Sequence, residues 1–225
     1  SSDSGFEETP VWALSGTFEH HISGCVALAA WNYYLVTKDK EWLKEKGFPI
    51  IKSTAEFWLD RVEKNEEGKY EIRNVVAADE WAENVDNDAF TNGVARRNLE
   101  IANMASEVLQ MKSDKRWTEI AQNLVIHTFE NGVTKEHKTY NGEGIKQADV
   151  NLLAYPLGII QAPSQIKKDL EYYEVRVPER DTPAMTQAIF SLLYARLGDK
   201  EKAYHFFKDA YVPNLNPPFR VIAET

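Results

Sequence analysis

Apolar residues recur at helical spacing along most of the chain. Residues 22–37 are apolar on nearly every side, which predicts a helix that is buried over most of its surface. Pro49 is expected to open a helix, because a proline in the first turn gives up no hydrogen bond, and Ser164 is expected to cap another. The ranges predicted as helices are 22–37, 40–63, 90–110, 115–129, 164–173, 183–197 and 200–211.

Three stretches depart from this periodicity. Residues 69–73 alternate between polar and apolar side chains after an Asn-Glu-Glu-Gly turn, which predicts a small β-hairpin near 69–76. Residues 130–145 are rich in Gly, Asn and Thr and are predicted to be a loop, and residues 146–155 are predicted to be a short buried element.

A weak repeat links the predicted helices. Asp39, Asp114 and Asp199 each lie between two helices, where an aspartate can cap the second one. Such a repeat indicates helical hairpins in series, as in an α-solenoid or a toroid of helix pairs. The unequal intervals between the three aspartates leave room for long loops, which favours an all-α toroid of the kind that carries enzymes.

Composition excludes several classes of protein. The 225 residues include 26 Lys and Arg against 35 Asp and Glu, a net charge of −9 without a basic stripe, so we expect no nucleic-acid partner. No apolar run approaches the roughly 18 residues that cross a bilayer, so we expect no membrane partner. The lone Cys25 excludes an intrachain disulfide and a cysteine-rich zinc site, and it fits a cytoplasmic as well as a periplasmic or secreted location.

Candidate chemistry is concentrated in residues 75–92, a loop between the predicted strand and a helix. The apolar residues 75–78 run directly into its carboxylates, and apolar surroundings raise a carboxyl pKa by desolvation, as a general acid requires. A plain acidic loop or a calcium-type loop is an equal alternative on spacing alone. The carboxylates are Asp79, Glu80, Glu83, Asp86 and Asp88, among Trp81, Asn84, Asn87 and Asn92.

Two further segments combine polar and apolar residues in ways that fit a site wall. Residues 146–151 place polar side chains at the start of a buried stretch, although a helix start with Asp149 near its N-terminus is the simpler interpretation. Residues 171–176 hold two tyrosines between glutamates, which fits either a sugar platform with a carboxylate base or a solvated helix end. His20 and His21 are adjacent and point to different faces, so no metal pair is expected, and no cofactor motif is present.

Four of these segments together resemble glycoside hydrolase family 65, which includes maltose, trehalose and kojibiose phosphorylases, acid trehalases and the glucosidase acting on glucosylgalactosyl-hydroxylysine. They match the family's motifs in the family's order and span nearly the whole chain. The matching segments are Glu19–Gly24, Asp79–Asn92, Lys146–Val150 and Pro183–Thr186.

The resemblance implies an (α/α)6 barrel and an inverting glycosidase that needs no cofactor and no metal. Glu80 would be the general acid that protonates the glycosidic oxygen, and Glu174, which follows Tyr173, would be the general base on water. An inverting pair of carboxyl groups is separated by roughly 6.5–9.5 Å, which leaves room for that water. The remaining residues implied to line the substrate site are Lys146, Gln147, His21, Trp81, Asn84 and Asn87.

Departures from the family's pattern favour hydrolysis over phosphorolysis. Phosphorylase members carry a His-Ser-Ser phosphate-binding segment where this chain has residues 180–183, and Asp181 would repel a phosphate. Trp81 and Ala82 replace the usual Tyr-His, a change in the leaving-group subsite. The alternatives are a phosphate-dependent disaccharide phosphorylase and a non-catalytic α-helical module that binds a glycan or a protein.

The chain is expected to be a single catalytic-domain fragment, residues 1–225, of an incomplete helical toroid. It starts at Ser1 and ends at Thr225 as though both ends were cuts, and the family's upstream Trp-Asp motif is missing. The expected partners are a small carbohydrate substrate and either the remainder of the parent chain or further copies of this one.

Overall fold

The computed structural model describes residues 9–10, 12–178 and 183–222. The chain is mostly helical, as predicted, with short strands. The elements in chain order are α1 (Ser15–Phe18), α2 (His21–Thr37), α3 (Lys40–Trp42), the π-helical η1 (Leu43–Gly47), α4 (Phe48–Arg61), β1 (Glu63–Lys64), β2 (Tyr70–Glu71), α5 (Ala89–Val108), α6 (Lys115–Asn123), η2 (Val150–Leu153), α7 (Pro163–Tyr173), η3 (Glu174–Arg176), α8 (Ala184–Leu197), α9 (Lys200–Asp209), η4 (Val212–Asn214), β3 (Leu215–Asn216) and β4 (Val221–Ile222).

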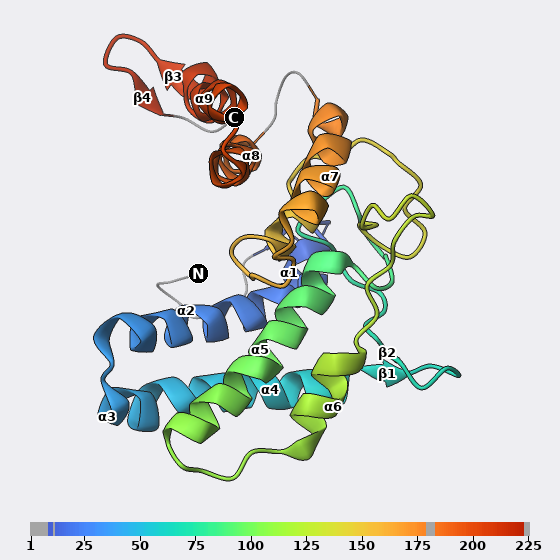
Figure 1. Cartoon of the computed structure of the whole chain (residues 1–225), viewed down its shortest axis with the longest axis vertical. Helices are drawn as coiled ribbons and strands as arrows, with labels where there is room; N and C mark the ends of the chain where they lie inside the picture. Colours follow the sequence, from blue (N-terminus) through green and yellow to red (C-terminus); the bar gives the residue numbers. More distant parts are fainter. Residues whose placement is uncertain (1–8, 11, 179–182, 223–225) are drawn as a thin grey trace.

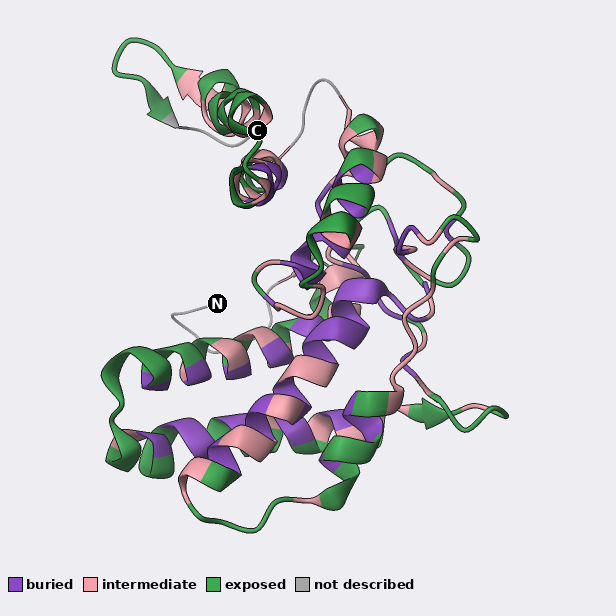
Figure 2. Cartoon of the chain, viewed as in Figure 1, coloured by how far each residue is buried: buried purple, intermediate pink, exposed green. Residues whose placement is uncertain are grey.

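Helix α5 runs through the middle of the group that it forms with α2, α4 and α6 (Figure 1). It is buried along much of its length (Figure 2), because apolar residues such as Val94, Leu99 and Ile101 recur around its axis and are fully enclosed. Helix α2 approaches α5 closely at Gly24, where a Cβ atom would lie 2.9 Å from a methyl carbon of Val94. A larger residue at position 24 would therefore push the two helices apart.

The three aspartates of the repeat cap helices, as predicted. Asp39 accepts a hydrogen bond from the Trp42 N–H at 2.9 Å, and Asp199 accepts one from the Lys202 N–H at 3.0 Å. Asp114 accepts from the Arg116 N–H at 2.9 Å. Each carboxylate satisfies one of the free N–H groups at a helix start, which fixes where each second helix of a hairpin begins.

Pro49 lies in the first turn of α4, as predicted, and the π-helical turn η1 precedes that helix. Two other predicted boundaries were wrong. The predicted helix 115–129 ends at Asn123. Ser164 is not a cap, because α7 already starts at Pro163, whose fixed φ suits the first helical position.

The predicted β-hairpin is present but starts earlier than expected. Strands β1 and β2 pair antiparallel with Glu63 opposite Glu71 and Lys64 opposite Tyr70. A second antiparallel pair, β3 with β4, was not predicted, because two-residue strands leave no alternation to detect. Residues 130–145 lack helices and named strands, as predicted, and the buried element within 146–155 is the 3₁₀ helix η2.

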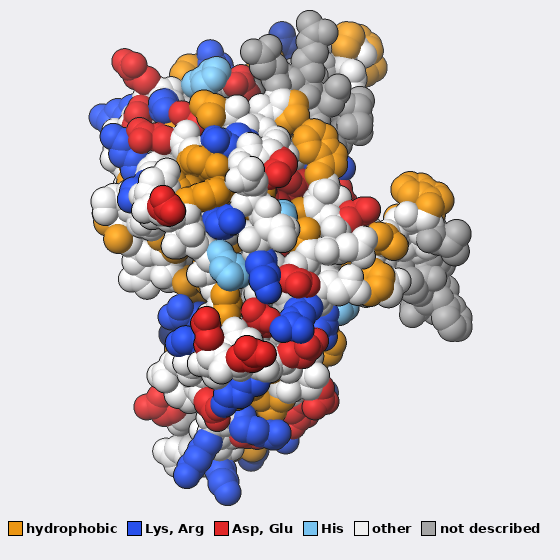
Figure 3. Space-filling model, turned by 90° about the vertical axis from the view of Figure 1, so that its right-hand side faces the viewer, with side chains coloured by type: hydrophobic (Ala, Val, Ile, Leu, Met, Phe, Trp, Pro, Cys, Tyr) orange, Lys and Arg blue, Asp and Glu red, His pale blue; other side chains and the backbone are white. Residues whose placement is uncertain are grey.

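The hairpin of α8 and α9 lies beside α7 at one end of the molecule (Figure 1). Gly198, at φ +82°, makes the left-handed turn that ends α8, and Asp199 then caps α9. Acidic and basic side chains are interspersed over the face shown in Figure 3. Among the described residues, no helix combines the length and the apolarity that a bilayer crossing requires.

Candidate active site

The acid candidate Glu80 lies at the tip of a tight turn between β2 and α5. The turn is closed by the Ala77 N–H on the Ala82 carbonyl at 3.1 Å and by the Ala82 N–H on the Asp79 carbonyl at 2.9 Å. Residues 75–77 before it are buried, as predicted. The turn therefore anchors one side of the loop in the core and presents Glu80 at the surface, where 43% of its side chain is exposed.

The structure brings Glu80 together with Lys146 and Gln147 from a distant part of the sequence. The Lys146 Nζ atom donates to Glu80 Oε2 at 2.6 Å, and the Gln147 amide Nε2 donates to the same oxygen at 2.7 Å. The Glu80 N–H returns a hydrogen bond to Gln147 Oε1 at 3.1 Å. Two sequence motifs that were singled out separately thus form one site.

Hydrogen bonds from Lys146 and then Gln147 hold the pKa of Glu80 below its usual range. The sequence prediction was the opposite, because the apolar residues before the acidic loop were expected to desolvate Glu80. They desolvate its neighbour Asp79 instead, and burial raises the pKa of that carboxyl. Adjacent residues of a turn point in different directions, so one enters the core while the other faces a cation.

The motif at residues 183–186 contacts the same site. The Thr186 hydroxyl accepts a hydrogen bond from the Ala148 N–H at 3.1 Å and lies 3.4 Å from the Lys146 carbonyl. It fixes the backbone of the segment that carries Lys146 and Gln147. Sequence reasoning found this motif only through the family resemblance. Residues 180–182, where the departure from the phosphorylase pattern lies, fall outside the described residues.

His21 lies at the start of α2, buried against the ring of Phe90 with 5.2 Å between ring centroids. Burial, helped by the charge of His20, lowers the pKa of His21 to about 4, so its imidazole is neutral near pH 7. The neighbouring Glu19 has its pKa raised by burial and by the negative charge of Glu80. The Glu19–Gly24 motif therefore lies close enough to the acidic turn for the two glutamates to interact.

Trp81 presents an exposed aromatic ring beside Glu80. Its side chain is 58% exposed, and a Cβ atom on Gly144 would lie 4.0 Å from the ring. The ring thus borders the loop that leads to Lys146. An exposed indole next to a carboxylate provides a flat apolar surface for a sugar ring.

The two asparagines predicted to line the site differ. Asn84 is exposed at a left-handed turn position, with φ 55°. Asn87 is 1% exposed; it accepts from the Ile72 N–H at 3.2 Å and donates to Glu71 at 3.2 Å. The carboxamide of Asn87 is used within the fold, because it ties the loop to β2.

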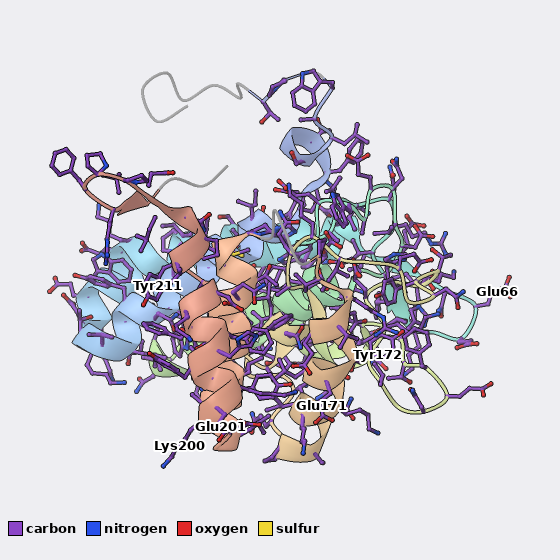
Figure 4. The ribbon with its side chains drawn as sticks, turned by 90° about the horizontal axis from the view of Figure 1, so that it is seen from above. Glu66, Glu171, Tyr172, Lys200, Glu201 and Tyr211 are labelled. Atoms are coloured by element: carbon purple, nitrogen blue, oxygen red, sulfur yellow. The ribbon has the colours of Figure 1, made fainter. Side chains whose placement is uncertain are left out.

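The base candidate Glu174 lies in η3, directly after α7. Its Oε1 atom accepts from Lys202 Nζ at 2.6 Å, its Oε2 atom accepts from the Tyr194 hydroxyl, and 14% of its side chain is exposed. Lys202 and Tyr194 come from α9 and α8, which lie beside α7 in Figure 4, where Glu171 and Tyr172 mark α7 and Lys200 marks the start of α9. The carboxylate is therefore fixed where three helices meet.

Sequence reasoning missed one buried acid, Glu136, in the polar loop 130–145. Glu136 is 1% exposed, and burial together with the charges of Asp79 and Asp88 raises the pKa of its carboxyl group to about 9. No signal in the sequence marks it, because a glutamate between a lysine and a histidine in a polar loop has the pattern of a solvated one. Among the described residues, no three His, Cys, Asp or Glu side chains are placed to hold a metal ion.

The chain is similar in sequence to known proteins over its whole length. The chain matches the Glycosyl hydrolase family 65 central catalytic domain over residues 4–143 and 134–219. It is 67% identical over 225 residues to a kojibiose hydrolase of Mucilaginibacter mallensis and 65% identical over 224 residues to one of Flavobacterium johnsoniae. Each match covers 100% of this chain and 33% of the relative, so the chain spans about a third of their length.

A solved structure, a candidate kojibiose phosphorylase from the human microbiome, has the same fold. The two superpose with a TM-score of 0.71 at 18% sequence identity, over 84% of this chain and 31% of the other. At that identity the likeness concerns the fold alone.

Proposed function

The chain belongs to glycosyl hydrolase family 65, and on that premise we propose that the protein carrying it hydrolyses a terminal α-linked glucose from a disaccharide or short glycan with inversion. Kojibiose, in which two glucose units are joined by an α-1,2 bond, is the first substrate to test, because the two relatives above 60% identity are named for its hydrolysis. The observation that carries the proposal is the junction of Glu80 with Lys146 and Gln147.

Glu80 is proposed as the general acid that protonates the glycosidic oxygen. Its carboxylate is paired with Lys146, which lowers its pKa and favours the ionised form, so before it can act it must take up a proton. If the hydroxyl groups of the terminal glucose take over Lys146 and Gln147, Glu80 loses both donors and its solvent access together. Both losses raise its pKa, so substrate binding itself would load the acid with its proton.

Glu174 is proposed as the general base that activates water. The Lys202 ammonium lies 2.6 Å from one oxygen of Glu174, and the Tyr194 hydroxyl fixes the orientation of the carboxyl group. Each carboxylate oxygen can accept more than one hydrogen bond, so a water can still bind beside these two donors. The same contacts would suit a carboxylate that only joins three helices, and the substitution described in the Discussion separates the two roles.

The rest of the proposed sugar site follows from position. Lys146 and Gln147 would hold the terminal glucose, and the neutral His21 would line the same side. Trp81, exposed beside Glu80, would stack on the leaving sugar, and Asn84 lies on the same exposed loop.

We propose that the helical hairpins described above are part of an (α/α)6 barrel whose remaining helices lie elsewhere in the protein. Helix α2 supports this, because its outer face exposes Ile22, Val26, Tyr33 and Val36, an apolar strip that a further element of the barrel would cover. A likeness of TM-score 0.71 to a much longer chain is consistent with a partial barrel.

The test is the cleavage of kojibiose by the full-length protein, followed by ¹H NMR of the anomeric protons with and without inorganic phosphate. The expected result is free glucose, with the β-anomer appearing first and no dependence on phosphate, because water attacks from the face opposite the α-bond. Glucose 1-phosphate formed only with phosphate would instead identify a phosphorylase. Binding of the disaccharide without cleavage would indicate a non-catalytic module.

A further inference from the structure

Four carboxyl side chains lie buried beneath the turn that carries Glu80. They are between 0 and 2% exposed, and the set consists of Asp79, Asp88, Glu136 and Asp149. Among the described residues, no three His, Cys, Asp or Glu side chains are placed to hold a metal ion. Four buried carboxylates cannot all be ionised in contact with one another, so protons must be shared among them.

Burial raises the pKa of Asp79, and hydrogen bonds from three backbone N–H groups act against that rise. Its Oδ1 atom accepts hydrogen bonds from the backbone N–H groups of Trp81 at 3.1 Å, Lys146 at 3.0 Å and Gln147 at 3.4 Å. Three N–H donors on one oxygen favour the carboxylate form. Asp79 thereby joins the turn that carries Glu80 to the segment that carries Lys146 and Gln147.

Glu136 is the opposite case. No N–H or hydroxyl group of the described residues donates to either of its carboxyl oxygens, and its hydrogen-bonding neighbour is the Asp79 carboxyl. Its backbone is fixed, because its carbonyl accepts from the Ala89 N–H at 2.6 Å. A carboxyl group without donors that touches an anion is stable only when it carries a proton and donates it to that anion.

Asp149 and Asp88 form a second pair of buried carboxyl groups, beside Glu136 and Asp79. Asp149 accepts from the Ala78 N–H at 3.2 Å and from the Phe90 N–H at 3.1 Å, and it is hydrogen-bonded to Asp88, the cap of α5. The acidic turn is thus held from below on both sides of Glu80. Asp149 holds the residue before Asp79, and Asp79 holds the residue after Glu80.

We infer that Glu136 is a positioning residue for the proposed reaction: as a neutral carboxylic acid it donates a hydrogen bond to Asp79 and so fixes the turn that aims Glu80 at the glycosidic oxygen. Glu136 does not touch substrate and acts through Asp79. The inference rests on the proposed function of Glu80 as the acid. Burial and the neighbouring negative charges, which raise the pKa of Glu136, support the neutral form.

The test compares Glu136→Gln with Glu136→Met in the full-length protein. The two replacements have similar length, but only the glutamine amide can donate to Asp79 in place of the carboxylic acid. Each variant is assayed on kojibiose and on α-glucosyl fluoride, whose fluoride leaves without needing a proton from the acid. A defect that acts through Glu80 must therefore appear on kojibiose and spare the fluoride.

The expected result is a loss in kcat on kojibiose of about 100-fold for Glu136→Met, against less than about fivefold on the fluoride, with little change in KM. Glu136→Gln should retain kojibiose kcat within about threefold of the wild type. Equal losses of Glu136→Met on both substrates, or a Glu136→Gln variant as damaged as Glu136→Met, would overturn the inference.

A second measurement is independent of activity and keeps the inference testable if Glu136→Met fails to fold. Infrared difference spectra between the wild type and Glu136→Gln at neutral pH should show the C=O stretch of one protonated carboxyl group that only the wild type has. Its absence would overturn the inference even in an active enzyme. A wild type that cleaves no α-glucoside but shows the band would instead contradict the proposed function and leave the neutral Glu136 in place.

Discussion

The Nζ atom of Lys146 lies 2.6 Å from Oε2 of Glu80, so the proposed acid is paired with a cation. This pair favours the ionised form of Glu80, whereas catalysis requires the protonated form. Both requirements are met if Lys146 is a ligand of the terminal glucose, as proposed above. Binding of the sugar then removes the cation from Glu80 at the moment when the acid is needed.

Replacement of Lys146 should move the pH profile in a defined direction. Lys146 lowers the pKa of Glu80, so Lys146→Met should raise it. Because kcat/KM falls as the pH rises through the pKa of the acid in the free enzyme, the basic limb should shift to higher pH. The value of kcat/KM should also fall, since a sugar ligand is lost.

The matched control for this profile is Lys167→Met, which removes an exposed lysine that pairs with Glu171 on α7. Its pH profile should coincide with that of the wild type. A basic limb of Lys146→Met that stays in place or moves to lower pH would contradict the pairing as the cause of the low pKa of Glu80.

Substitution of Glu174 distinguishes a general base from a structural anchor. Glu174→Gln should lower kcat on kojibiose and on α-glucosyl fluoride alike, by about 10³-fold, because both reactions need an activated water. The control is Glu171→Gln, three residues earlier on α7, whose carboxylate is half exposed and should be dispensable. If Glu174→Gln stays active but melts at a lower temperature, Glu174 is an anchor for Lys202 and the base lies elsewhere.

The sequence predicted most of the fold because helical periodicity and capping are local properties. The apolar stripe of α5 and the caps at Asp39, Asp114 and Asp199 depend on residues within a few positions of one another. The boundary at Ser164 and the end of the predicted helix 115–129 were wrong because several local solutions satisfy the same residues, and packing selects among them.

The sequence predicted the separate motifs of the site but not how they meet. Residue spacing does not determine the direction of a side chain or its contacts with distant segments. The apolar run before Asp79 and Glu80 indicated one desolvated carboxyl group, and the turn geometry assigns it to Asp79. The contact of Glu174 with Lys202 depends on how α7 and α9 pack. Glu136 has no local signal at all, since its burial comes from Asp79 and from the start of α5.

The buried Glu136 should make stability depend on pH. Its pKa is raised from 4.5 to about 9 by burial and by the charges of Asp79, Asp88 and Glu143. Between these values the folded protein holds a proton that the unfolded chain releases, so the free energy of unfolding falls as the pH rises. The free energy of unfolding falls by at most about 1.4 kcal/mol per pH unit in this range. Above the pKa of the folded state this pH dependence disappears.

Chemical denaturation of Glu136→Gln against the wild type tests this linkage. The variant carries no titrating group at this position, so it should be the more stable protein at neutral pH, and its advantage should shrink as the pH falls toward 4.5. A difference in unfolding free energy that is constant over this range would contradict a raised pKa at Glu136.

The cap of α9 should contribute measurably to stability. Asp199 accepts from the Lys202 N–H at 3.0 Å, and α9 also supplies the Lys202 side chain to Glu174. Asp199→Ala should lower the free energy of unfolding by about 1 kcal/mol, whereas Asp199→Asn, which keeps an accepting oxygen, should cost less. Equal losses for both substitutions would show that the cap bond is not the cause.

The most direct test of the account is the leaving-group dependence of Glu80→Gln in the full-length protein, with Glu83→Gln from the same exposed loop as control. We predict that Glu80→Gln lowers kcat on kojibiose by about 10³-fold or more and lowers kcat on α-glucosyl fluoride far less. Glu83→Gln should resemble the wild type on both substrates. A Glu80→Gln variant that still cleaves kojibiose at near wild-type rate, or that loses both activities equally, would contradict Glu80 as the acid.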